Sequence, residues 1–464
     1  MDKVRTIEEA FAGMTDGVTI AVGGFGMGHR LPSTLIEAVS NSGVKDICLV
    51  ANGIGMGPSS AEQWVINGQV NRLKVSFSAR AGKRTIPEEK VAAGEIELEV
   101  VPQGMLVDRM RAAAAGIPAF YSPTGVGTPI ADGKEVREFG GRPYILELAL
   151  PVDYSLLRAH RADRAGNVEF RGASRNFNPA FAKAARNAIV EADEIVEVGE
   201  IDPENVGLPG IFVTSVVQST VVIPPDLNQY GRRAADSRRE YDGKPALTRS
   251  QMAARAAALI EDGSYVNLGA GLPNLMASHL AHRDIWLHGE NGILGYGERI
   301  GGADEFDPDV FDAGGGFVRG KAGMSFFDSV TSFEVARGGR LTHVALGGYQ
   351  VDSAASLANW SNPNQVGGGV GGAMDLVAAQ TNLIIVMEHC DSSGGPKLVS
   401  HCTYPLTGAH CVNTVVTDLA VLNFRDGRFV IDEVAPGFTA EEVLALSTID
   451  AGISDNVGVM SVPD

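Results

Sequence analysis

The chain has 464 residues, 44% hydrophobic and 20% charged, a composition typical of a globular protein with two or three domains. Its net charge of -18 argues against a nucleic-acid-binding surface, and the lack of any uninterrupted run of 18 apolar residues argues against a membrane span. Because the N-terminus has no apolar signal-peptide core and only four cysteines occur, we expect a cytoplasmic protein.

Near the N-terminus, the apolar residues 18–22 predict a strand, which leads through the glycine-rich loop 23–28 into a helical pattern at 34–39. The loop does not match the dinucleotide-binding fingerprint, because His29 or Leu31 stands where the third glycine belongs. Two interpretations remain open for this loop. It either packs a strand against a helix or holds a phosphate or pantetheine group.

Further short apolar runs predict strands, and those at residues 188–192 and 383–387 predict buried ones, because their apolar residues are largely continuous instead of alternating. These runs are residues 47–51, 96–101, 188–192, 211–217 and 383–387. Ala-rich amphipathic segments, such as residues 108–113, alternate with them and predict helices. Thr248 is the expected N-cap of one more helix. The buried face of that helix is predicted to contain Met252, Ala253, Ala256 and Ile260.

The order of elements in the first half recurs in the second. Residues 265–268 predict a strand, and a glycine loop and a helical pattern at 275–280 follow it. We therefore predict an α/β fold with two similar open, mostly parallel sheets related by duplication. The expected domains are residues 1–225 and 246–464, separated by a charged, exposed linker at 226–245.

Ligands of open α/β sheets bind at the carboxyl ends of the strands, and Glu290 is expected at such an end. It follows a short apolar run and precedes an Asn-Gly turn, with further glycines close behind. A carboxylate among residues with little side chain can be approached closely by a substrate and can act as a covalent nucleophile. The alternative is a solvated turn glutamate.

Two other segments offer hydrogen-bond donors. The glycines of residues 369–372 precede a helical pattern, so their N–H groups either bind an oxyanion or form a tight helix entry. Gln103 follows the predicted strand at 96–101. Its side-chain amide is therefore expected either at the edge of the sheet or on the surface.

Three His-Cys pairs, at residues 389–390, 401–402 and 410–411, combine two types of zinc ligand. Adjacent residues on a strand point to opposite faces, so the members of one pair would not converge on a metal. No C-x-x-C spacing is present. We therefore predict a structural role for these pairs and no metal site.

Taken together, these segments resemble the family I coenzyme A transferases, specifically the 3-oxoacid group. The resemblance runs from about Thr6 to the C-terminus. Motifs similar to the α subunit lie at residues 23–26, 101–104, 140–147 and 174–179. Motifs similar to the β subunit lie at residues 267–273, 290–292, 371–377 and 405–408. A fused α–β chain of this family would also explain the internal duplication.

The resemblance implies a ping-pong reaction in which Glu290 becomes a glutamyl-CoA thioester. It also implies that the side-chain amide of Gln103 and the backbone N–H of Gly372 form the oxyanion hole. CoA would then be a substrate and part of a covalent intermediate, and no cofactor would be bound permanently. The residues implied in CoA binding are Gly24, Phe25, Gly26, Met27, Gly28, Asn267, Gly269, Gly271, Asn291 and Gly371.

The partners implied by the resemblance are acyl-CoA esters such as succinyl-CoA, small carboxylic acids such as 3-oxo acids, and a second copy of the chain in a homodimer or higher homo-oligomer. The sequence departs from the family pattern at residues 27–30, 297–300 and 362–369, and the last of these segments lacks a usual lysine. The acceptor acid is therefore left open. The alternatives are an acyl-CoA hydrolase or CoA-dependent ring-opening hydrolase on the same fold, and a non-catalytic CoA-binding protein.

Overall fold

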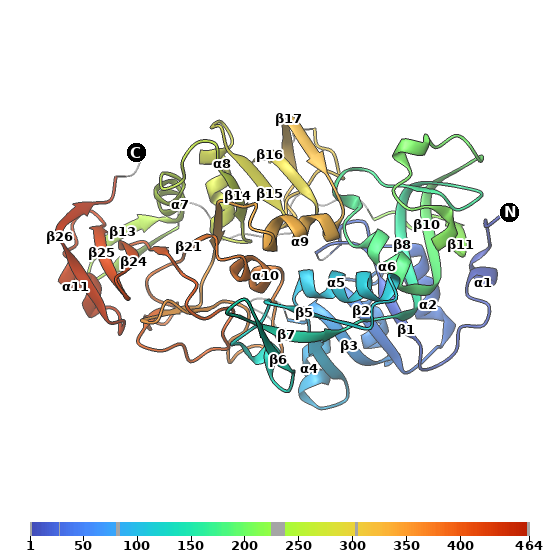
Figure 1. The fold of residues 1–464 in the computed structure, drawn as a ribbon, viewed down its shortest axis with the longest axis horizontal. Coiled ribbons are helices and arrows are strands. Elements are labelled where there is room, and N and C mark those ends of the chain that lie inside the picture. Colours follow the sequence, from blue (N-terminus) through green and yellow to red (C-terminus); the bar gives the residue numbers. More distant parts are fainter. Residues whose placement is uncertain (1, 27, 80–83, 224–236, 302–304, 462–464) are drawn as a thin grey trace.

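The computed structural model describes residues 2–26, 28–79, 84–223, 237–301 and 305–461. Two sheets, each flanked by helices, lie side by side along the long axis of the molecule, with the two ends of the chain far apart (Figure 1). Their mostly parallel strands confirm the predicted α/β class.

The first sheet is parallel apart from one short strand. In sheet order its parallel strands are β11 (Ser215–Gln218), β10 (Ala185–Val196), β8 (Val152–Asp163), β1 (Thr19–Val22), β2 (Ile47–Gly53), β3 (Val70–Phe77) and β4 (Glu97–Val100). The short strand β9 (Val168–Glu169) is antiparallel to β8. The helices of this half are α1 (Ile7–Ala10), α2 (Ser33–Ser42), α3 (Glu62–Ile66), α4 (Ile86–Ala92), α5 (Gln103–Ala114) and α6 (Asn178–Ala184). A small antiparallel sheet of β5 (Ala119–Ser122), β7 (Arg142–Leu148) and β6 (Val136–Phe139) completes it.

The second sheet is parallel in its centre and mixed at its ends. In sheet order its strands are β17 (Val318–Phe326), β16 (Ile293–Arg299), β15 (Trp286–Gly289), β14 (Tyr265–Leu268), β18 (His343–Leu346), β21 (Asn382–Val386), β23 (Thr414–Val416), β24 (Ala420–Arg425), β25 (Arg428–Val434) and β26 (Ala451–Val459). The strands from β15 to β23 are parallel to one another, and β16, β17 and β24 pair in antiparallel fashion.

The helices of the second half are α7 (Arg249–Ala257), α8 (Ala277–Leu280), α9 (Ser329–Arg337), α10 (Ala373–Ala378) and α11 (Ala440–Ala445). A three-stranded sheet of β20 (Leu357–Ala358), β19 (Gln350–Asp352) and β22 (Leu398–Val399) is formed separately from the main sheet. Thr248 is the N-cap of α7, as predicted, since its hydroxyl accepts the N–H of Gln251 at 3.1 Å. Met252, Ala253 and Ala256 form a buried face of α7 as predicted, whereas Ile260 is buried but lies beyond the end of the helix.

Most predicted strands are confirmed, and two local predictions are wrong. The run 211–217 is not one strand, because residues Gly210–Phe212 form a 3-10 turn that leaves Ile211 86% exposed before β11 begins. The helical pattern at 275–280 is split into a 3-10 turn, Pro273–Met276, and the short helix α8. Proline lacks the N–H that a continuous helix needs and restricts the residue before it, which explains the irregular start.

Residues 224–236 of the predicted interdomain region lie outside the described residues. The remainder of the predicted linker contains β12 (Arg238–Tyr241), which pairs with β13 (Lys244–Thr248). The Tyr241 hydroxyl donates to the Asp418 carboxylate at 3.0 Å, so this hairpin is attached to the second half. The proposed domain boundaries remain a prediction.

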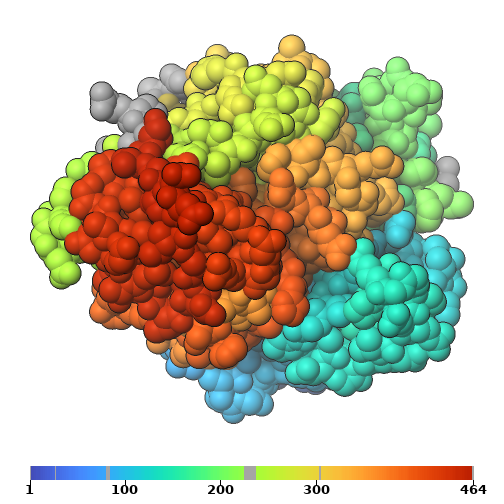
Figure 2. Space-filling model, turned by 60° about the vertical axis from the view of Figure 1, so that its left-hand side comes forward, coloured from blue at the N-terminus to red at the C-terminus, as the bar shows by residue number. Residues whose placement is uncertain are grey.

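One apolar core extends through both halves, and a second lies within the first half. Leu106 of α5 and Phe333 of α9 are fully buried within the same cluster, and α5, α9 and α10 pack together where the halves meet. The space-filling view shows the yellow-to-red second half lying directly against the cyan and teal residues of the first (Figure 2). Among the described helices, none has both the length and the apolar character needed to cross a membrane.

Candidate active site

Glu290 lies at the carboxyl end of β15, in the turn that leads into β16. Gly292 adopts a φ of 96° in this turn, and a Cβ there would lie 2.0 Å from the carbonyl oxygen of Phe327. A larger residue at this position would collide with the neighbouring backbone. The turn can therefore close tightly and hold the glutamate at the edge of the sheet, as the sequence predicts.

The Glu290 side chain is buried close to two other acidic groups. Burial raises its pKa to about 7, and the nearby carboxylates of Asp312 and Asp375 act in the same direction. Its own backbone N–H opposes the shift. A carboxylate desolvated in this way is less stabilised by its surroundings, and it is therefore a better nucleophile than one in water.

Gln103 is the first residue of α5 and is only 2% exposed, so the surface alternative for this residue is excluded. Its backbone N–H donates to the carbonyl of Gly371 at 2.9 Å, a bond that joins the two halves. Its side-chain Nε2 donates to Oδ1 of Asn52 at 2.7 Å. The amide donor therefore faces Asn52 in this conformation, and a half-turn of the carboxamide would direct it to the opposite side.

Gly372 is the residue at which the three predicted catalytic groups meet. A Cβ placed on it would lie 3.1 Å from Cγ of Glu290 and 3.2 Å from Oε1 of Gln103. The same Cβ would lie 3.2 Å from the ring of Phe333. Gly372 is also the N-cap of α10, so the start of that helix lies beside the glutamate. Three separate segments of the sequence are thus brought together.

Asp375, which sequence reasoning missed, fixes this arrangement. Its Oδ2 accepts the backbone N–H of Gly104 at 2.8 Å, and its Oδ1 accepts the hydroxyl of Thr124 at 3.0 Å. Arg337 forms ion pairs with both Asp375 and Asp108. Burial raises the pKa of Asp375 to about 6, and the Arg337 guanidinium opposes that rise. The carboxylate connects α5, α9 and α10.

A cavity of about 360 Å³ opens beside Glu290. Its walls come from the carboxyl ends of the parallel strands of the second sheet and from the first half opposite them, a location typical of open α/β sheets. The lining residues are Phe77, Gln103, Arg249, Gly269, Ala270, Leu272, Glu290, Ala313, Leu346, Gly347, Gly348, Tyr349, Asn359, Gly369, Val370, Gly371, Gly372, Ala373, Val386, Met387, Glu388 and Lys397.

Of the residues predicted to bind CoA, Gly269 and Gly371 line this cavity. Met27 lies outside the described residues. The other predicted residues do not line the cavity and are Gly24, Phe25, Gly26, Gly28, Asn267, Gly271 and Asn291. Several have evident structural roles. Phe25 stacks on Phe177, the Asn267 amide donates to the His288 carbonyl, and the Asn291 amide donates to the Phe311 carbonyl.

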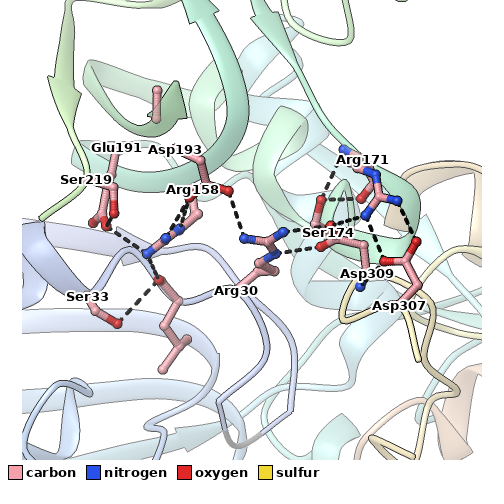
Figure 3. A network of polar contacts seen from close by, with 12 residues as sticks. Arg30, Ser33, Arg158, Arg171, Ser174, Glu191, Asp193, Ser219, Asp307 and Asp309 are labelled. Carbon is pink, nitrogen blue, oxygen red and sulfur yellow. Dashed lines mark hydrogen bonds and ion pairs between the residues drawn. The ribbon is translucent and has the colours of Figure 1, made fainter. Parts of the chain in front are cut away.

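The loop after β1 is bound to the second half by charged groups. Arg30 donates to Asp309 at 2.5 and 2.6 Å and to Asp193 at 2.8 Å, and Arg171 contacts both Asp309 and Asp307 (Figure 3). The Asp309 side chain is fully buried. Arg158 continues the network from Asp193 into the first sheet. The segment that joins β1 to α2 therefore also contacts the second half, through Arg30 and Asp309.

His29 occupies the same interface. Its ring stacks on Phe311 with centroids 4.1 Å apart, and its Nε2 donates to the carbonyl of Gly315 at 3.1 Å. Burial lowers the pKa of His29 to about 4, so the ring is neutral near pH 7. Close by, Asp312 and Arg299 form an ion pair near Glu290. Two of the segments that depart from the family pattern therefore meet on this side of the glutamate.

The His-Cys pairs do not form a metal centre. Within the described part of the chain, no three His, Cys, Asp or Glu side chains are close enough together to hold a metal ion. His389 is fully buried, with one ring nitrogen 3.1 Å from the Thr417 hydroxyl and the other 3.2 Å from the Val443 carbonyl. It has a structural position between two elements of the second half.

Comparisons with known proteins agree with this architecture. The sequence pattern described as coenzyme A transferase matches residues 4–219 and 250–446. A mouse mitochondrial succinyl-CoA:3-ketoacid coenzyme A transferase 2B is 37% identical over 480 aligned residues, which cover 99% of this chain and 90% of that protein. One of the 3-oxoadipate CoA-transferase polypeptides from Pseudomonas putida is 47% identical over 213 residues, covering 46% of this chain and 91% of that polypeptide.

The fold has a solved counterpart. The crystal structure of an acyl-CoA transferase from Escherichia coli O157:H7 matches with a TM-score of 0.79. The match covers 99% of this chain and 95% of that chain at 19% sequence identity. The two-sheet arrangement is thus the same along nearly the whole length of both proteins.

Proposed function

The chain belongs to the coenzyme A transferase family, and we propose that it moves CoA from succinyl-CoA, or a related acyl-CoA, to a 3-oxo acid through a thioester on Glu290. The observation that carries the proposal is the convergence of Glu290, Gln103 and Gly372 at one end of a cavity between the halves. The names of the similar transferases from mouse and Pseudomonas putida support the choice of substrates.

In the proposed first step, the Glu290 carboxylate attacks the thioester carbonyl of the acyl-CoA. A carbon–oxygen bond forms, the carbon–sulfur bond breaks, and CoA leaves as a thiolate, which yields an acyl-glutamyl anhydride. The thiolate then attacks the glutamyl carbonyl and displaces the first acid as its carboxylate. A second acid reverses both steps. No proton transfer is required, because each nucleophile is an anion.

Each attack creates an oxyanion that needs a hydrogen-bond donor. Gly372 is adjacent to the glutamate side chain and begins α10, so the partial positive charge of that helix start favours an anion there. The Gln103 amide contributes in this proposal after its half-turn away from Asn52. Because Gln103 and Glu290 are both nearly buried, the proposed anhydride is shielded from water.

The proposal is tested by incubating the protein with succinyl-CoA in the absence of an acceptor acid. We expect release of succinate and a stable protein adduct with the mass of CoA minus water, located by peptide mass spectrometry on Glu290. Glu290→Gln should form no adduct. Acetoacetate and 3-oxoadipate should each then be tried as acceptors. Continuous CoA release without any acceptor would instead identify a hydrolase and would contradict the transferase proposal.

A further inference from the structure

The cavity extends along the edge of the second sheet, away from Glu290. Strands β15, β14, β18 and β21 are parallel neighbours in that order, so their carboxyl ends form one row. The residues that directly follow the first three strands, Glu290, Gly269 and Gly347, line the same cavity, and so do Met387 and Glu388, the first two residues after β21. Neighbouring strands are about 4.8 Å apart, so three spacings place the end of β21 about 14 Å from the end of β15.

The far end of this row carries basic side chains. Arg249, the first residue of α7, donates to Glu388 at 2.7 Å, and each of these side chains is 16% exposed. Lys397, which precedes β22, lines the same end of the cavity. The Nε atom of Arg249 is buried and has no hydrogen-bond partner among the described residues. A buried donor without an acceptor lowers the stability of the fold unless a ligand or a water molecule accepts its hydrogen bond.

The charges around Lys397 leave this end suitable for an anion. Burial lowers the pKa of Lys397 to about 8, so its ammonium group is still mostly protonated at pH 7. Glu388 and Asp418 attract the ammonium group, whereas Arg239 and Arg249 repel it. At this end of the cavity lining, the two cations Arg249 and Lys397 accompany one carboxylate, that of Glu388. The net charge of these three side chains is therefore positive.

The middle of the row is made of glycines. A Cβ on Gly347 would meet no atom within 4 Å, so the missing side chain leaves open space in the cavity. Gly269 and Gly348 lie on either side, where a Cβ would come within 2.8 Å of Leu346 and 2.9 Å of Met387, respectively. These positions therefore form a floor without side chains, over which a narrow, extended ligand can lie between Glu290 and Lys397.

We propose that Arg249 and Lys397 bind the pyrophosphate of CoA while its sulfur lies at Glu290. The assignment rests on the proposed function, since it takes CoA as the substrate. An extended chain gains about 1.2 Å per bond, so the roughly 13 bonds from the sulfur to the first phosphorus of CoA span about 15 Å. That length fits the separation along the strand row. Arginine and lysine are the side chains that recognise phosphate best.

The test compares three donors: succinyl-CoA, succinyl-dephospho-CoA and succinyl-pantetheine, which lacks all phosphates. Arg249→Met and Lys397→Met should each raise KM about 10- to 100-fold for the first two donors. Neither variant should change kcat/KM for succinyl-pantetheine. Equal losses with all three donors would overturn the assignment, because they would indicate a structural defect. Losses confined to succinyl-CoA would also overturn it and would identify the 3′-phosphate as the group bound.

The control is Arg255→Met, on the same helix but paired with Glu433 away from the cavity. Arg255→Met should leave the KM of all three donors at the wild-type value. Calorimetric titration of each variant with free CoA needs no turnover, and it therefore tests this site independently of the reaction. A dissociation constant raised about 10-fold or more by both cavity substitutions supports the assignment even if no acid accepts CoA. An unchanged dissociation constant refutes it.

Discussion

The backbone N–H of Gly104 donates to the carboxylate of Asp375 at 2.8 Å, which joins the first turn of α5 to the first turn of α10. A Cβ on Gly104 would lie 2.5 Å from that carboxylate, so the contact depends on the glycine. Because Gln103 precedes Gly104 and Gly372 precedes α10, this one bond fixes two of the proposed catalytic groups relative to each other. The catalytic competence of the site should therefore depend on how the halves are joined as well as on the reacting groups.

Replacement of Gln103 tests its role as an oxyanion donor. Gln103→Ala should lower kcat by about 10²- to 10³-fold, the usual effect of removing one such donor. Steady-state kinetics with succinyl-CoA and an accepting 3-oxo acid measure the change. The matched control is Gln69→Ala, since Gln69 is also buried but donates to the carbonyls of Val39 and Val44. The control should lose stability and retain kcat, and a similar kcat for both variants would contradict the proposed role.

The raised pKa of Glu290 predicts how the first half-reaction depends on pH. Only the carboxylate form attacks the thioester, and burial raises the pKa of the group to about 7. Below that value, kcat/KM for the acyl-CoA should fall about tenfold per pH unit, and above it the rate should level off until the Lys397 ammonium group, with a pKa of about 8, loses its proton. Stopped-flow measurement of CoA release between pH 5 and pH 9 follows this step. A profile that stays level down to pH 5 would show that the glutamate is not the titrating nucleophile.

The same shift predicts the effect of pH on stability. The pKa of Glu290 is about 7 in the folded chain and about 4.5 in the unfolded chain. The contribution of this group to the free energy of unfolding is therefore most favourable below about pH 4.5. That advantage is lost as the pH rises to and through 7. Glu290→Gln removes the cost of burying a charge. It should therefore stabilise the protein by roughly 3 kcal/mol more at pH 8 than at pH 4.5.

Urea unfolding of wild type and Glu290→Gln at both pH values measures this difference. The comparison at two pH values separates the charge effect from packing effects, which do not titrate. A constant difference between the two proteins would mean that the glutamate titrates at its ordinary pKa.

The strands and the position of Glu290 at the end of a strand could be predicted because their signals are local. The run at residues 265–268 became β14 without change, since a continuous apolar segment between turn residues has few other ways to be buried. Glu290 was predicted from the glycines around it. The split at 273–280 was not foreseen, because the pattern of apolar residues at 275–280 does not distinguish a 3-10 turn from an α-helix.

The rest of the site depends on contacts between distant segments, which periodicity does not reveal. Asp375 lies in α10 of the second half, yet it accepts the N–H of Gly104 in α5 and shares Arg337 with Asp108 of the same helix. Asn52 lies near the end of a strand and gives no signal that it contacts Gln103. A polar residue in an apolar segment was the available clue, and its partner could be found only from the fold.

Removal of the buried carboxylate between the halves should lower the stability of the protein. Asp309→Asn leaves Arg30 and Arg171 without the charge that they share, and the Asp309 side chain is fully buried. Arg30 keeps its ion pair with Asp193 and Arg171 keeps its pair with Asp307, so the free energy of unfolding should fall by about 2–3 kcal/mol. Chemical denaturation should show this loss. The control, Asp307→Asn, alters a carboxylate that is 34% exposed and pairs with Arg171, so it should cost about 1 kcal/mol or less. Equal effects would contradict a special role for Asp309.

Gly372→Ala tests whether the close approach of three groups is needed for catalysis. The φ of -89° at Gly372 is accessible to alanine, so the backbone should tolerate the change. The new methyl group would instead lie 3.1 Å from Glu290 and 3.2 Å from Gln103, and both side chains would have to shift. A displacement of reacting groups by about 1 Å can lower a rate about 10²-fold. We expect that loss in kcat with a change in stability of about 1 kcal/mol or less.

Gly458→Ala in β26 is the matched control, because its methyl group would lie at an ordinary 3.5 Å from Glu433, remote from the cavity. It should retain wild-type kcat. Adduct formation on Glu290, followed by mass spectrometry after mixing with succinyl-CoA, should be slowed in Gly372→Ala and unchanged in Gly458→Ala. Normal adduct formation in Gly372→Ala would show that the nucleophile does not depend on this glycine, and the oxyanion site would then have to be formed by other donors.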